Sequence, residues 1–145
     1  MNAIQTPIAT QTLLADRFIL TAVEKFTLVF PAVWVAEILR IDRSQILELP
    51  FYDPLLMGIV HHDGQIVPLI SAARLLKVEQ FGVRERSIVI KLNQAAGTIA
   101  NIGLVVDRAI GNTPRQDLPP EIFTTATTAS GMLLMRPDLI PTDLW

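Results

Sequence analysis

The sequence has no cysteine, few charged residues and no long apolar run, and each shortage excludes a class of protein. The lack of cysteine excludes disulfides and thiolate metal sites and fits a cytosolic chain. Only 18% of the residues are charged and the net charge is −2, so a basic surface for nucleic acid is not expected. The longest apolar run, Leu28–Ala36, has nine residues and contains Pro31. A membrane-spanning helix needs about 20.

These shortages predict a soluble, cytoplasmic protein that neither inserts into a membrane nor binds nucleic acid. Residues 1–15 lack the basic start and compact apolar segment of a signal peptide, and we expect them to form a flexible tail. Residues 16–145 are then a single domain, long enough for two small lobes. Half of all residues are hydrophobic, so we expect some apolar surface to stay exposed in the monomer and to be buried in an assembly.

The segment Leu56–Ile70 is the most informative part of the chain. Its Asp63-Gly64 pair suits the two central positions of a tight hairpin turn, both of which require positive φ. The predicted pairing places Val60 opposite Val67 and leaves both faces of the hairpin largely apolar. A strand pair with one face in water normally alternates between apolar and polar residues. The second face must therefore be covered, by another sheet or by a partner protein.

Other short apolar segments, separated by turn signals, predict further strands. They are Phe18–Ala22, Lys25–Phe30, Ile46–Leu49, Ile88–Leu92, Ile102–Val106 and Met132–Met135. Apolar residues of Ile88–Leu92 and Ile102–Val106 recur with period two, which predicts a second hairpin. Ala72–Leu76 is typical of a single helical turn, and no long amphipathic helix is present. Turn signals about every ten residues indicate an all-β barrel or sandwich.

Three polar or proline-rich stretches predict loops and a boundary. Gly111–Glu121 holds three of the ten prolines and is expected to be a loop. Thr124–Ser130 is a low-complexity polar stretch that we expect to be a mobile loop. Gln80–Glu85 is polar and contains a glycine, so it is the best candidate for a boundary between two hairpin-rich halves.

Catalytic and cofactor motifs are absent from the sequence. It has no G-x-S-x-G elbow, no phosphate-binding loop and no H-E-x-x-H motif, so we expect a protein that is not an enzyme and needs no cofactor. His61 and His62 are its two histidines. Neighbouring strand residues point to opposite faces, so these side chains cannot easily share one metal ion. We therefore predict no metal site and interpret both histidines as polar residues at a hairpin tip.

Four motifs occur in an order that resembles one known family. Val35-Ala36-Glu37-Ile38 is similar to a V-x-E-I segment. Residues 57–60 and then 63–70 are similar to a K-G-V-x-N-x-R-G-x-I-V-P-V-x-D-L block. Ile88–Asn93 is similar to the strand that opens the second half, and Gly103–Asp107 to a returning G-x-V-V-D strand. Together they span most of residues 18–136, and the pattern resembles that of CheW, the adaptor of bacterial chemosensory arrays.

The resemblance implies both a fold and a function. The implied fold is two intertwined, SH3-like, five-stranded β-barrel lobes around a shared hydrophobic core. CheW-like proteins couple chemoreceptors to a histidine kinase and so control motility. One lobe would contact the regulatory domain of a CheA-like histidine kinase. The groove between the lobes would receive the helical cytoplasmic tip of a methyl-accepting chemoreceptor.

The sequence departs from the family pattern in three places. The family arginine before the hairpin glycine is Asp63 here, which reverses the charge at a position used for receptor contact. The family Asp-Leu pair after the second strand is Ser71-Ala72, and Pro137 and Pro141 curtail the C-terminal helix. We therefore expect a partner of complementary charge, or service in a different array, such as one that steers pili or phototaxis.

Five residues are candidate partner contacts: Val35, Glu37, Gly58, Asp63 and Val105. Each also has a structural interpretation. Val35 and Val105 fit a hydrophobic core, and Glu37 fits a solvated charge. Gly58 fits a bulge or tight packing, and Asp63 fits the turn alone.

Two functions of different classes follow from these observations. The first is a non-catalytic adaptor, in which apolar strand faces supply binding energy and charged rim residues select the partner. The alternative is a stand-alone β-barrel sensor for a small ligand, which a cavity inside a closed barrel would favour. A self-assembling structural domain is a third, weaker interpretation.

Overall fold

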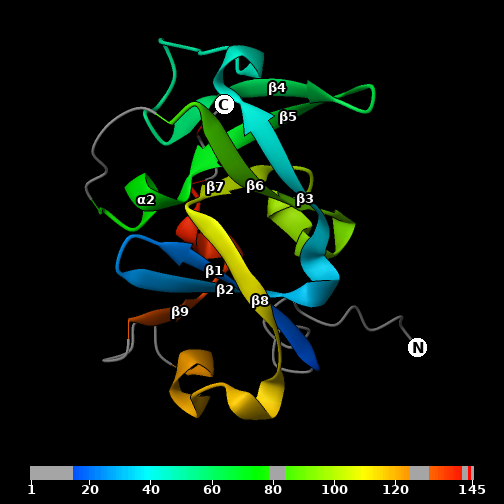
Figure 1. Ribbon diagram of the computed structural model, residues 1–145, viewed down its shortest axis with the longest axis vertical. Helices are drawn as coiled ribbons and strands as arrows, with labels where there is room; N and C mark the ends of the chain where they lie inside the picture. Colours follow the sequence, from blue (N-terminus) through cyan, green and yellow to red (C-terminus); the bar gives the residue numbers. More distant parts are fainter. Residues whose placement is uncertain (1–14, 79–83, 125–130, 142–143, 145) are drawn as a thin grey trace.

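The computed structural model describes residues 15–78, 84–124, 131–141 and 144 (Figure 1). Nearly all of the predicted tail at residues 1–15 and of the predicted loop Thr124–Ser130 lies outside these ranges, as does most of Gln80–Glu85. Within the described ranges, no helix has the length and hydropathy needed to cross a bilayer.

Strands dominate the described residues and form two sheets, the larger above the smaller in Figure 1. The five-stranded sheet has the order β3 (Val35–Asp42), β6 (Arg86–Leu92), β7 (Gly103–Val106), β5 (Gln65–Ser71) and β4 (Leu56–His62). The four-stranded sheet has the order β8 (Arg108–Pro114), β1 (Arg17–Val23), β2 (Phe26–Pro31) and β9 (Met132–Leu134). The predicted all-β fold is confirmed. The smaller sheet has four strands among the described residues, where five were expected.

The helical elements are short and connect the strands. They are α2 (Ala72–Leu75) and the 3-10 helices η1 (Ala32–Trp34), η2 (Arg43–Gln45), η3 (Gln94–Ile99), η4 (Arg115–Asp117), η5 (Pro120–Phe123) and η6 (Pro137–Leu139). Ser71 caps α2, because its hydroxyl oxygen accepts a hydrogen bond from the backbone N–H of Arg74 at 3.2 Å. Serine and aspartate are both good N-caps, so the departure from the family pattern at this position preserves the helical turn.

The main hydrophobic core lies between the two sheets. Ile90 and Leu104 of the larger sheet meet Leu28 and Phe30 of the smaller one, and all four are fully buried. A second core belongs to the smaller sheet and lies under η5. A third core lies inside the larger sheet and consists of Ile41, Val60, Val67, Leu69 and Val89. Ile90 and Leu92 of β6 enter the main core and Val89, on the opposite face, enters the third core, as the alternation of side chains along a strand requires.

The larger sheet curls until its two edge strands are joined. After β3 and η2, Leu47 pairs with Ile59 of β4 through two backbone hydrogen bonds of 2.9 Å. Gly58 makes this approach feasible, because a Cβ atom there would lie 2.4 Å from the carbonyl oxygen of Leu47. Its φ of 154° also suits glycine, and the β4–β5 register shifts between Leu56 and Gly58. The third core is therefore the interior of a small barrel.

Two expectations about chain organisation are wrong. The predicted loop Gly111–Glu121 begins inside β8, which pairs with β1 and ends at Pro114. This strand is largely exposed and lacks apolar alternation, so its sequence resembles a loop. Gln80–Glu85 does not separate two halves either. It connects α2 to β6, and the strands on both sides of it, β5 and β6, belong to the same sheet.

Candidate partner-binding surface

The β4–β5 hairpin has the geometry that its sequence predicts. Asp63 and Gly64 adopt φ values of 50° and 75°, as a two-residue turn of this kind requires. The register places Val60 opposite Val67, which confirms the predicted pairing. One face of the hairpin, with these two valines, fills the barrel interior. The other face consists of Ile59, His61, Ile66 and Pro68, and we call it the hairpin outer face.

The hairpin outer face is only partly covered by the described residues. Ile66 is 62% exposed, while Ile59 and Pro68 are half-buried. Leu47, which pairs with Ile59, is also exposed. An apolar residue on a rigid strand gains free energy when a partner removes it from water, about 25 cal/mol for each Å² of apolar surface. The predicted need for a cover is therefore not met within the described part of the chain.

A group of polar side chains closes one end of the barrel beside this hairpin. Glu37 lies two residues from Leu39 on β3, and Lys91 lies two residues from Val89 on β6. Alternation along a strand places these side chains on the same face as the third core, at its end. His62 and Gln65 pair across the hairpin and reach the same place. With Asp63, these residues form what we call the mouth cluster: Glu37, His62, Asp63, Gln65 and Lys91.

Short contacts hold the mouth cluster together. The Nε2 atom of His62 lies 2.7 Å from Oε2 of Glu37 and 3.3 Å from Oδ2 of Asp63. The ammonium of Lys91 donates to the side-chain oxygen of Gln65 at 3.4 Å. The contact between His62 and Glu37 links the hairpin to β3, two segments that lie 25 residues apart in sequence. His62 thus flanks the hairpin tip as a polar residue, and it also makes a contact to β3 that the sequence did not indicate.

The five predicted contact residues do not form one site. Glu37 and Asp63 meet at His62. Val35 is half-buried at the start of β3 and packs against the main core. Gly58 is buried against the backbone of Leu47, which gives it a complete packing explanation.

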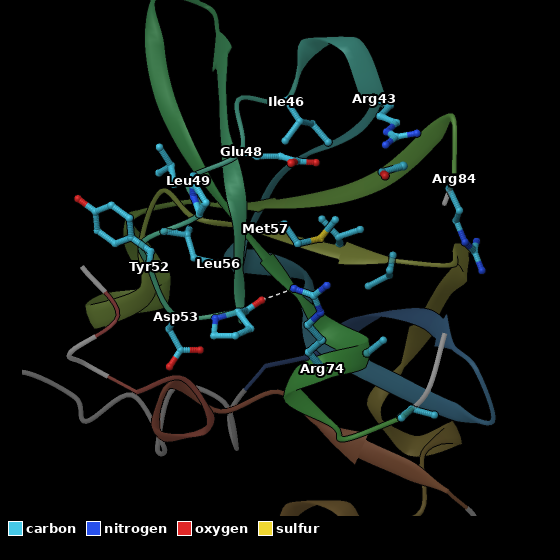
Figure 2. A pocket seen from close by; sticks show the side chains of 17 residues that line it. Arg43, Ile46, Glu48, Leu49, Tyr52, Asp53, Leu56, Met57, Arg74 and Arg84 are labelled. Atoms are coloured by element: carbon cyan, nitrogen blue, oxygen red, sulfur yellow. Dashed lines mark hydrogen bonds between the residues drawn. The ribbon is translucent and has the colours of Figure 1, made fainter. Parts of the chain in front are cut away.

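Val105, the fifth of these residues, lies at the opposite end of the barrel. It packs against the third core and also lines a cavity of about 650 Å³. The cavity lies between α2, the 43–57 segment and the ends of β6 and β7 (Figure 2). Its lining carries both signs of charge, because three arginines face it together with Glu48 and Asp53.

The arginines of this cavity are not equivalent. Figure 2 shows Arg43 and Arg84 at the end away from Tyr52, while Arg74 rises from α2 below them. Arg74 donates a hydrogen bond to the carbonyl oxygen of Pro54, and Arg84 forms an ion pair of 3.1 Å with Asp107. Two of the three arginines are thus engaged in holding loops in place. Sequence reasoning missed this group because its members come from four separate segments.

The fold and the exposed strand face define a class: an all-β domain of two SH3-like lobes that share a core. The chain belongs to the CheW-like domain family, which matches residues 17–136. Among solved structures, it is similar to scaffolding protein TtCheW from Thermoanaerobacter tengcongensis, with a TM-score of 0.64 and 16% sequence identity. That likeness covers 91% of this chain and 98% of the other. A search of curated proteins gave no match.

Proposed function

We propose that this chain is a non-catalytic adaptor that couples a chemoreceptor to a CheA-like histidine kinase in the cytoplasm. Membership of the CheW-like family supports a general role as a chemotaxis scaffold. The observation that carries the specific proposal is the hairpin outer face, where Ile66 is 62% exposed on a rigid strand. An adaptor needs such a surface, because apolar area buried against a partner supplies most of the binding energy.

The charged residues beside this face give it a means of selecting its partner. Glu37 and Asp63 carry two negative charges at the rim of the hairpin, and His62 lies between them. Charges at a rim change binding free energy little but discriminate strongly against partners of like charge. Because Asp63 replaces a family arginine, the complementary receptor should present a basic side chain where other receptors present an acidic one.

The direct test is reconstitution with a CheA-like histidine kinase and a chemoreceptor from the same organism. The purified chain should bind the regulatory domain of that kinase, and separately the cytoplasmic fragment of that receptor, at concentrations of tens of micromolar or lower. Size-exclusion chromatography of the three proteins together should then yield a ternary complex. Lack of association with either protein at these concentrations would contradict the proposal.

The cavity at the other end of the barrel favours the sensor as a second candidate function. Its volume of about 650 Å³ falls within the range of small-molecule sites. The barrel interior itself is filled by the third core, so a ligand would have to bind in this cavity, outside the interior. Thermal unfolding against a panel of acidic metabolites distinguishes the two functions. A ligand that raises the Tm by several degrees supports the sensor function. If no metabolite in the panel shifts the Tm, the sensor function is rejected.

A further inference from the structure

We propose that Glu37, His62 and Asp63 form a binding site for a divalent transition-metal ion, for which Zn²⁺ is the natural probe. Their donor atoms, two carboxylate oxygens and one imidazole nitrogen, all lie within 4.8 Å of one another. Imidazole nitrogen and carboxylate oxygen are both ordinary zinc ligands. The histidine distinguishes this group from a cluster of acidic residues, because it adds the donor that selects transition metals over calcium or magnesium.

The spacing of the donors is close to that of an occupied site. A tetrahedral zinc ion with ligand distances of about 2.1 Å holds neighbouring donors about 3.4 Å apart. The separation between His62 Nε2 and Asp63 Oδ2 is already 3.3 Å. Glu37 Oε2 is closer, at 2.7 Å, and must withdraw by less than about 1 Å. Its side chain is 43% exposed, so a small rotation accomplishes this.

The backbone holds the three residues where a metal ion needs them. His62 ends β4 and Asp63 occupies the turn with a φ of 50°, while Glu37 lies on β3 after a register shift. The barrel closure brings these segments together, so the chain loses little conformational entropy when a metal ion binds to the three side chains. Three protein ligands leave a fourth position open, and the exposure of Asp63 places that position in solvent.

A single hydrogen bond explains the positions of these three side chains less completely than a bound metal ion does. The Nε2 atom of His62 carries at most one hydrogen, yet it faces carboxylates on both Glu37 and Asp63. A metal ion at that nitrogen would engage both carboxylates at once. Lys91 is opposite Glu37 in the sheet, and its ammonium contacts Gln65. This positive charge weakens metal binding, so we infer a reversible site rather than a structural one.

The test compares zinc binding by the whole chain and two histidine variants. His61→Gln is the matched control, because His61 is adjacent but points to the opposite face and belongs to no metal-ligating group among the described residues. Isothermal titration at pH 7.5 should show one equivalent of Zn²⁺ for the wild type and for His61→Gln. Affinity should fall at least tenfold in His62→Gln. Absence of saturable binding, or equal affinity in His62→Gln, overturns the proposal.

A second measurement shows where the ion binds. Zinc should raise the Tm of the wild type and of His61→Gln, because it links β3 to the hairpin in the folded state alone. His62→Gln should show no such rise, and far-UV circular dichroism of the apo proteins should confirm that all three are folded. An equal rise in all three contradicts the site. These experiments need no partner, so their outcome is separate from that of the adaptor proposal.

Discussion

Gly103 shows how tightly the barrel interior is filled. A Cβ atom there would lie 2.5 Å from Cγ1 of Val89 and 3.0 Å from Cδ2 of Leu69, two fully buried core side chains. We expect Gly103→Ala to lower the free energy of unfolding by about 1–3 kcal/mol, because neither neighbour has room to move. Urea denaturation measures the change. Gly111→Ala is the matched control, since a Cβ atom at Gly111 meets nothing within 4 Å. Equal stability of the two variants would contradict the close packing.

Asp107 joins the two sheets through its side chain. Its carboxylate accepts a hydrogen bond from the backbone N–H of Glu24 in the β1–β2 turn and pairs with Arg84 before β6. We expect Asp107→Ala to cost about 1–3 kcal/mol of stability, because it removes a hydrogen bond to a charged carboxylate together with the ion pair to Arg84. Asp117→Ala, at an exposed position in η4, should change stability by less than about 0.5 kcal/mol. Thermal denaturation of both variants tests the difference.

The sequence predicts such residue contacts only where they are local. The Asp63-Gly64 turn was predictable because two adjacent residues determine its φ values. The contact between Glu37 and His62 was not, since it depends on how the whole sheet curls. The sequence also placed His61 and His62 on opposite faces correctly. It gave no indication that His62 would meet two carboxylates.

At the scale of elements, hairpins with apolar alternation were predictable and exposed edge strands were not. The β6–β7 pair follows its period-two pattern because Ile90, Leu104 and Val106 share the face that packs in the main core, while the other face is mixed in character and carries Lys91. Successive residues of strand β8 are exposed to solvent, so burial does not require apolar and polar residues to alternate along it. Its strand conformation comes from pairing with β1, a tertiary interaction. The five strands of the larger sheet match the prediction, and the smaller sheet has four among the described residues.

The junction between the 46–49 segment and β4 offers a test of barrel closure. A side chain at Gly58 would collide with the carbonyl oxygen of Leu47 at 2.4 Å. We expect Gly58→Ala to push this segment away and to break the hydrogen bonds between Leu47 and Ile59. Hydrogen exchange should show loss of protection at these two amides, with the amides of β1 and β2 unchanged. Uniform loss of protection across both sheets would instead indicate global destabilisation and contradict a local role.

At the scale of the whole molecule, the two ends of the larger barrel differ in character. One end is closed by the mouth cluster, and the other opens into the cavity lined by Val105. The smaller sheet packs its own core under η5, whose Ile122 is fully buried there. Under the proposed adaptor function, the larger lobe supplies the hairpin outer face, and the smaller lobe supports it through the shared core.

The exposed isoleucine of the hairpin tests whether this lobe binds a partner. Ile66→Asp places a charge where a partner would cover apolar surface, and desolvating that charge is costly. We expect at least a tenfold loss of affinity for the kinase domain or the receptor fragment, with the Tm nearly unchanged because Ile66 is 62% exposed. Ile110→Asp is the matched control, as Ile110 is 47% exposed on β8 of the other sheet. Surface plasmon resonance measures both variants. If Ile66→Asp binds both partners as tightly as the wild type does, the hairpin outer face is not the interface.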